Sequence, residues 1–116
     1  MKFIYPPKNA DCSTLLKHIF DLNKLDVKVY KDLTKSGEIR VDILAKKLNR
    51  DRATVYRSLQ KLISYGLCTR EKHVIKTGGY YHVYSALDLD SIREKMKSCI
   101  EEWYRSMKEM VEMFDN

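Results

Sequence analysis

Hydrogen-bonding side chains alternate with apolar ones between residues 52 and 65, at the spacing of an amphipathic helix. The apolar positions are Val55, Leu59, Leu62 and Ile63. The polar positions on the other face are Arg52, Thr54, Tyr56, Arg57, Gln60 and Lys61. Arginine can form two parallel hydrogen bonds with guanine, and glutamine can do so with adenine. This face therefore has the chemistry needed to read base edges in a DNA major groove.

These side chains are expected to divide between base and phosphate contacts. Arg52 and Arg57 are the candidates for guanine, and Gln60 is the candidate for adenine. Thr54 and Tyr56 can meet a phosphate or a thymine methyl group. The basic residues expected mostly to hold phosphates are Lys46, Lys47, Arg50, Lys61, Arg70, Lys72 and Lys76. Phosphate contacts raise affinity and make it depend on salt, but they carry no sequence choice.

A shorter helix is predicted just before this one. Its apolar stripe consists of Ile43, Leu44 and Leu48, with Ala45 as a small packing residue. Residues 49–52 form the turn, and Gly66 ends the second helix because glycine readily takes a positive φ. Two short helices at a sharp turn form a helix-turn-helix, whose second helix is the candidate DNA reader. Such helix pairs also occur in proteins that never bind DNA.

A β-hairpin is predicted directly after the second helix. Residues 67–75 and 80–84 have the composition of strands, and residues 76–79 form a turn in which Gly78 and Gly79 supply positive φ angles. A hairpin in this position is a wing, and its basic arm and glycine tip suit contact with phosphates or the minor groove. The alternative is a solvated hairpin that only covers the core.

The positive charge of the chain is concentrated on these elements. The net charge is +6, yet residues 40–76 alone carry +7 because they hold ten basic and three acidic residues. All other residues together carry −1. This distribution is the electrostatic footprint of a nucleic-acid binder.

A long amphipathic helix is predicted near the C-terminus, with Asp90 as its N-cap. Apolar residues recur along it in steps of three and four, as in a coiled-coil seam. We expect the seam to pair with a second copy of the chain. The expected dimer contacts are Leu89, Ile92, Met96, Cys99, Trp103, Met107, Met110 and Phe114. The alternative is that the helix folds back on its own winged domain.

The predicted elements define a mainly α protein with a small β-wing, an α+β fold class. Residues 1–87 are expected to form a winged helix-turn-helix domain with an N-terminal helix, and residues 88–116 a dimerisation helix. Two helices precede the helix-turn-helix. The first ends near Asp21, and the second covers residues 27–35 with Asp26 as its N-cap.

Other classes of function find little support in the sequence. It contains no GxSxG, P-loop or HExxH motif, so neither an enzyme nor a cofactor is expected. Cys12, Cys68 and Cys99 lie far apart with no CxxC, which predicts neither a zinc site nor a disulfide framework. His73 and His82 can face each other across the wing as two metal ligands, but exposed or hydrogen-bonded hairpin histidines are more common. The N-terminal apolar run is too short for a signal peptide and no stretch can span a membrane, so a cytoplasmic protein is expected.

Three segments carry a family likeness. They are LAKKLNRDRATVYRSLQKLISYGLCTR at residues 44–70, the glycine-tipped GGYYHVY at 78–84, and Glu102-Trp103-Tyr104. Through them the chain resembles the archaeal TrmB-like regulators of the winged-helix (MarR/ArsR-like) group, including the short archaellum regulators of the EarA type. The resemblance implies that residues 52–65 form the recognition helix. Full-length TrmB proteins carry a large sugar-binding domain after the wing, where this chain has only a helix, so sugar sensing is not implied.

The sequence thus predicts a homodimeric transcriptional regulator that binds double-stranded DNA at specific sequences. Its recognition helix is expected in the major groove and its wing on the backbone or in the minor groove. The alternative from another class is a winged-helix adaptor that binds protein within a transcription complex or another assembly.

Overall fold

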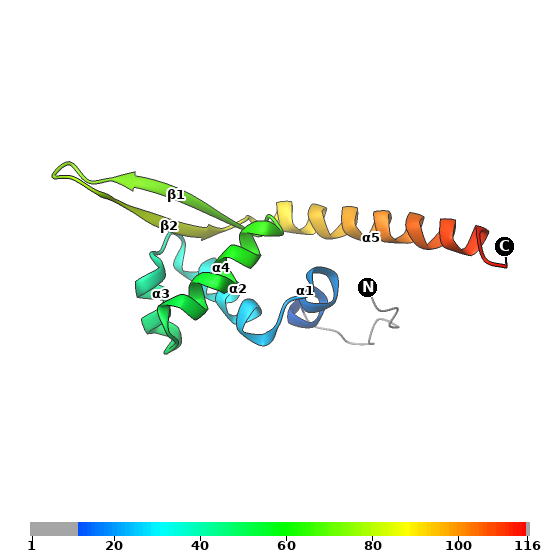
Figure 1. Ribbon diagram of the computed structural model, residues 1–116, viewed down its shortest axis with the longest axis horizontal. Helices are drawn as coiled ribbons and strands as arrows, with labels where there is room; N and C mark the ends of the chain where they lie inside the picture. Colours follow the sequence, from blue (N-terminus) through cyan, green and yellow to red (C-terminus); the bar gives the residue numbers. More distant parts are fainter. Residues whose placement is uncertain (1–11, 116) are drawn as a thin grey trace. The chain divides into compact units, whose positions relative to one another are not determined.

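Five helices and one β-hairpin make up the part of the chain that the computed structural model describes, residues 12–115 (Figure 1). The chain divides between Ala86 and Leu87 into two units. The first unit holds α1 (Cys12–Phe20), α2 (Lys24–Ser36), α3 (Val41–Leu48), α4 (Arg52–Ser64), β1 (Cys68–Val74) and β2 (Tyr80–Ala86). The second holds α5 (Leu89–Glu112). The predicted fold class, mainly helical with a small β-wing, is confirmed.

Helix α2 begins earlier than the sequence predicts. Its N-cap is Asn23, whose side-chain oxygen accepts a hydrogen bond from the backbone N–H of Asp26 at 2.8 Å. The carboxylate of Asp26 accepts one from the N–H of Asn23 at 3.0 Å. This capping box satisfies two backbone donors that the helix itself leaves unpaired. The prediction of Asp26 as the N-cap is therefore wrong, because the acid occupies the third helical position and not the cap.

The core of the first unit is built from the apolar faces of its helices. Its apolar side chains with no more than 1% exposure are Val29, Leu33, Leu44, Val55, Leu59, Leu62 and Leu67. In α3 the buried face follows Val41, Leu44, Ala45 and Leu48, the i, i+3, i+4, i+7 pattern of one helix face. Ile43 falls outside that pattern and is 48% exposed. Its expected place in the apolar stripe is therefore wrong.

The helix-turn-helix forms where it was predicted. Asn49 ends α3 in the left-handed region with φ 53°, and Asp51 is the N-cap of α4. Gly66 follows α4 with φ 75°, and the N–H of Leu67 donates to the carbonyl of Leu62 at 2.9 Å. This bond closes the helix end in the manner that a glycine with positive φ permits.

Strands β1 and β2 form a two-stranded antiparallel sheet. Gly78 (φ 116°) and Gly79 (φ 82°) make the turn, as the sequence predicts. His73 lies opposite Tyr81, and His82 follows Tyr81 in the strand. Successive strand residues point to opposite faces, so the two histidines face apart. A metal pair formed by these two histidines is therefore excluded.

The segment before α3 is tied to β2. The N–H of Ile39 donates to the carbonyl of Tyr84 at 3.0 Å, and the N–H of Tyr84 donates to the carbonyl of Ile39 at 2.8 Å. Both side chains are buried. The base of the hairpin is thereby fixed to the entry of the helix-turn-helix.

Helix α5 contains 24 residues, which corresponds to about 36 Å at 1.5 Å per residue. Its N-cap is Asp88, whose side chain accepts a hydrogen bond from the N–H of Ser91 at 2.9 Å. Asp90 lies in the first turn and pairs with Arg93 at 3.2 Å. The prediction of Asp90 as the N-cap is wrong because the acid two residues earlier takes that place.

The expected dimer contacts on α5 differ in exposure. Ile92 is buried, and Leu89, Met110 and Phe114 are between 64% and 84% exposed. Half-exposed positions lie between them at Met96, Cys99, Trp103 and Met107. Among the residues described, no helix is both long enough and apolar enough to cross a membrane.

Candidate nucleic-acid interface

The outer face of α4 presents a basic and aromatic surface. Arg52, Tyr56 and Arg57 are all exposed, Tyr56 at 39%. The inner face is held by Val55 and Leu59, which have no exposed surface. Because core packing fixes the helix, the three outer side chains project from a rigid support, as a DNA-reading helix requires.

A chain of hydrogen bonds runs along the first turn of α4. The hydroxyl of Thr54 donates to Oδ2 of Asp51 at 2.6 Å, and Nη2 of Arg57 donates to Oγ1 of Thr54 at 3.3 Å. The bond from Thr54 holds the pKa of the Asp51 carboxyl below its usual value. The Thr54 hydroxyl, expected to contact DNA, thus serves the helix cap and orients the guanidinium of Arg57.

Two further polar residues of α4 are turned toward the protein. Nζ of Lys61 lies 2.8 Å from Oδ2 of Asp26, which is 1% exposed, and the hydroxyl of Ser58 donates to Oδ1 of Asp26 at 2.7 Å. This bond to Asp26 raises the pKa of Lys61. Nε2 of Gln60 is shielded from solvent and has no hydrogen-bond partner among the described residues. Lys61 therefore joins α4 to α2, and the amide of Gln60 must rotate outward to meet a base.

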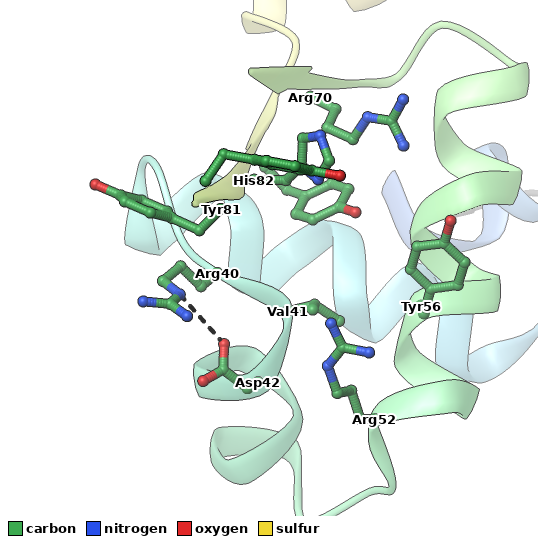
Figure 2. A pocket seen from close by; sticks show the side chains of 10 residues that line it. Arg40, Val41, Asp42, Arg52, Tyr56, Arg70, Tyr81 and His82 are labelled. Atoms are coloured by element: carbon green, nitrogen blue, oxygen red, sulfur yellow. Dashed lines mark ion pairs between the residues drawn. The ribbon is translucent and has the colours of Figure 1, made fainter. Parts of the chain in front are cut away.

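A cleft of about 490 Å³ lies between α4, the start of α3 and the hairpin (Figure 2). Three arginines from separate segments line it: Arg40 before α3, Arg52 in α4 and Arg70 in β1. Its aromatic lining consists of Tyr56, Tyr80, Tyr81, His82 and Tyr84. Guanidinium groups beside aromatic rings suit a phosphate together with its sugar or base. The cleft thus connects the outer face of α4 to the wing.

Arg40 and Tyr81 are site residues that the sequence did not reveal. The guanidinium carbon of Arg40 lies 4.8 Å from the ring centroid of Tyr81, and its Nε lies 3.5 Å from Oδ1 of Asp42 (Figure 2). The two residues are brought together by the bridge between Ile39 and Tyr84. The available signal was a basic residue directly before a helix, which by itself predicts no such contact.

The basic residues expected outside α4 are all exposed. They are Lys46, Lys47, Arg50, Arg70, Lys72 and Lys76, and the turn residues Gly78 and Gly79 are exposed as well. Nζ of Lys72 lies 4.2 Å from the ring centroid of Tyr80, which supports the ammonium at the wing surface. Nζ of Lys47 donates to the hydroxyl of Ser36 at 3.0 Å.

Solved structures that share this fold define its class. A possible transcriptional regulator from Methanosarcina mazei Go1 matches with a TM-score of 0.80 and 24% identity, over 98% of this chain and 97% of its own. The ST1889 protein of Sulfolobus tokodaii matches with a TM-score of 0.65 and 24% identity, over 80% of this chain and 91% of that protein. The MarR protein of Peptoclostridium difficile matches with a TM-score of 0.55 and 22% identity, over 86% of this chain and 63% of that protein. The chain has the winged-helix fold of these proteins.

The family model described as the sugar-specific transcriptional regulator TrmB matches residues 16–90. The chain belongs to the TrmB family, which confirms the resemblance. Two uncharacterized proteins of Methanocaldococcus jannaschii are similar to it. MJ1503 is 40% identical over 99 residues, covering 85% of this chain and 75% of that protein, and MJ1082 is 35% identical over 107 residues, covering 92% and 88%. The family consists of transcriptional regulators and not enzymes, so the chain is a DNA-binding regulator.

Proposed function

We propose that two copies of this chain bind one double-stranded DNA site, each with α4 in the major groove and the hairpin on the backbone or in the minor groove. The observation that carries the proposal is the exposed face of Arg52, Tyr56 and Arg57, which continues through the cleft to Arg70 of the wing. A reading helix and a basic hairpin therefore share one cationic surface, while the other side of α4 packs into the core.

Base reading and backbone contact fall to different residues. Arg57, oriented by Thr54, and Arg52 are the readers, each able to form two hydrogen bonds with guanine. Lys72 and Lys76 of the wing hold phosphates, which positions the helix without selecting a sequence. Lys61 has no part in this surface because its ammonium is bound to Asp26.

Helix α5 supplies the surface through which two copies pair. Trp103, Met107, Met110 and Phe114 continue one stripe at heptad spacing, and the last two are more than 60% exposed. An exposed apolar stripe on a helix about 36 Å long fits a second copy of the same helix. A two-fold dimer presents its two α4 helices to half-sites about one turn of DNA apart, so the operator is an inverted repeat.

The test compares Arg57→Ala with Lys72→Ala by fluorescence anisotropy, on a duplex from the protein's own upstream region and on a random duplex. Arg57→Ala should lose about 1–3 kcal/mol of binding free energy on the specific duplex alone. Lys72→Ala should weaken both duplexes alike and reduce the salt slope by about one. Arg93→Ala is the matched control, since that arginine is exposed, lies on α5 and pairs with the nearby Asp90.

Equal losses on both duplexes for Arg57→Ala contradict its role as a base reader. The absence of any binding even at low salt contradicts the proposal as a whole and favours the protein-binding adaptor.

A further inference from the structure

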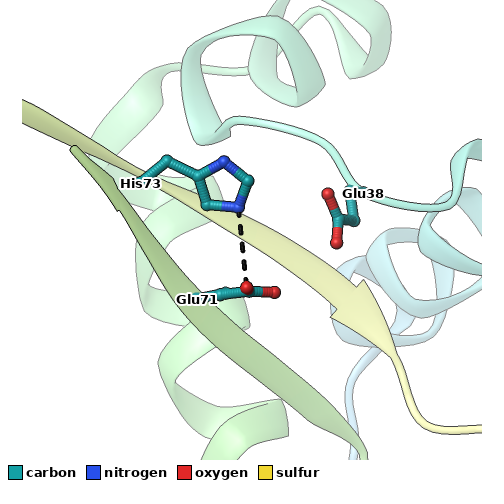
Figure 3. A group of neighbouring side chains, drawn as sticks. All are labelled: Glu38, Glu71 and His73. Carbon is teal, nitrogen blue, oxygen red and sulfur yellow. Dashed lines mark ion pairs between the residues drawn. The ribbon is translucent and has the colours of Figure 1, made fainter. Parts of the chain in front are cut away.

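Three potential metal ligands meet between the wing and the entry of α3 (Figure 3). Glu71 and His73 lie two residues apart on β1, so their side chains leave the same face of the strand. Glu38 reaches them from the segment that joins α2 to α3. One donor atom from each side chain lies within 4.8 Å of the other two. These residues face away from Arg70 and Lys72, which alternate with them along β1.

The imidazole of His73 is the observation that points to a ligand. Its Nε2 is shielded from solvent and has no hydrogen-bond partner among the described residues. The nearest carboxylate oxygen, Oε1 of Glu71, lies 3.8 Å away, which is too far for a hydrogen bond. The ring is held by Tyr81, with the two ring centroids 5.3 Å apart. The side chain of His73 is 34% exposed, yet its Nε2 is shielded, lacks a hydrogen bond and faces the Glu71 carboxylate at ion-pair distance, an arrangement that suits a metal ligand.

We propose that Glu38, Glu71 and His73 bind a divalent transition-metal ion, with Zn²⁺ as the best match. One imidazole nitrogen and two carboxylate oxygens are donors that Zn²⁺ accepts, and water completes the coordination. Ligand atoms around tetrahedral Zn²⁺ lie about 3.3 Å apart at bond lengths near 2.0 Å. Both glutamates are exposed, so their side chains can close the remaining distance without moving the backbone.

The bound ion links the wing to the helix-turn-helix. Glu38 directly precedes Ile39, which is already bridged to β2, and His73 lies farther along β1 toward the turn. A metal that joins Glu38 to His73 stiffens the hairpin relative to α3 and α4. Less conformational entropy is then lost when the wing settles on DNA. This second step rests on the proposed DNA binding, whereas the metal site itself does not.

The first experiment measures metal binding without DNA. The full chain, freed of metal with a chelator, is titrated with Zn²⁺ by calorimetry and with Co²⁺ by visible absorption. We expect one ion per chain and Co²⁺ bands without thiolate charge transfer. His73→Gln and Glu38→Gln should each weaken binding by about tenfold or more. His82→Gln is the matched control, because His82 lies on the same hairpin but faces the opposite side of the sheet.

Thermal melts without metal establish that each variant is folded, and a rise in Tm with Zn²⁺ in the wild type but not in His73→Gln supports the site. Binding by His73→Gln with wild-type affinity, or no saturable binding by the wild type, overturns it. Anisotropy with DNA at fixed salt then tests the coupling: Zn²⁺ should tighten DNA binding by the wild type and not by His73→Gln. Unchanged DNA affinity overturns the coupling alone. A chain that binds metal but no DNA contradicts the proposed function and leaves the metal site supported.

Discussion

Replacing Asp26 by alanine tests whether the position of α4, the proposed recognition helix, depends on a buried carboxylate of α2. The carboxylate of Asp26 is 1% exposed and accepts hydrogen bonds from the N–H of Asn23 at 3.0 Å, the hydroxyl of Ser58 at 2.7 Å and Nζ of Lys61 at 2.8 Å. Ser58 and Lys61 both belong to α4. One side chain therefore completes the capping box of α2 and holds α4 against α2.

The expected loss of stability follows from these three contacts. Loss of half the capping box costs about 1 kcal/mol. The hydroxyl of Ser58, on a residue that is 5% exposed, loses its acceptor at a cost of about 1–3 kcal/mol. The side chain of Lys61 is 35% exposed and can turn to solvent, so the ion pair adds only about 1 kcal/mol. Asp26→Ala should lower the free energy of unfolding by about 3–5 kcal/mol.

The assay is equilibrium unfolding in urea, followed by circular dichroism, with a thermal melt in parallel. The Tm should fall by about 15 °C or more. Asp32→Ala, which removes a half-exposed acid from the same helix, is the matched control and should cost little. A double-mutant cycle between Asp26→Ala and Lys61→Ala should give a coupling energy of about 0.5–3 kcal/mol. A loss for Asp26→Ala no larger than for Asp32→Ala would refute the reasoning.

Three further predictions concern pH, thiol chemistry and assembly. Burial raises the pKa of Asp26, but the hydrogen bonds that the carboxylate accepts outweigh burial, so the pKa lies below its usual value of 3.8. The stability that Asp26 contributes is therefore complete above about pH 4 and is lost as the pH falls through the lowered pKa. Acid titration of the wild type and of Asp26→Asn measures this loss. Burial raises the pKa of the Cys68 thiol to about 11, so at pH 8 an alkylating reagent should reach Cys68 only on unfolding, as peptide mapping by mass spectrometry will show. Trp103→Glu places a charge in the apolar stripe of α5 and should give a monomer in sedimentation experiments. Ser98→Glu, at an exposed polar position of the same helix, is the control and should leave the dimer intact. A dimeric Trp103→Glu would contradict pairing through this stripe.

The elements that the sequence predicts correctly depend on local patterns. The periodic apolar positions of α4 and the Gly78-Gly79 turn lie within single segments, so spacing alone indicates them. The prediction that Asp26 and Asp90 are N-caps is wrong, because both lie in the first turn of their helices. An acid before an apolar run can occupy either the cap or the first turn. Both positions favour negative charge at a helix N-terminus, which is why composition does not separate them.

The candidate site is harder to predict because its geometry depends on contacts between distant segments. The bridge between Ile39 and Tyr84 brings Arg40 to the hairpin, and no local pattern encodes it. The same bridge brings Glu38 near His73, so the proposed metal site also escapes a search for closely spaced ligands. Sequence reasoning finds ligands that share one helix or strand, and it misses those that the fold assembles from separate segments.

The polar face of α4 shows how this limit affects the prediction of DNA contacts. The spacing makes all six polar residues candidates for DNA contact. In the structure, however, the hydroxyl of Thr54 bonds to the N-cap Asp51, and the ammonium of Lys61 pairs with Asp26. For Lys61, the buried carboxylate of Asp26 is a better partner than a solvated phosphate, because the carboxylate has already lost its water on folding. A recognition helix must also be held in place, and Thr54 and Lys61 serve that purpose in α4. Polarity alone therefore does not separate candidate DNA contacts from structural residues, and Arg52, Tyr56 and Arg57 are the candidates that the structure leaves exposed.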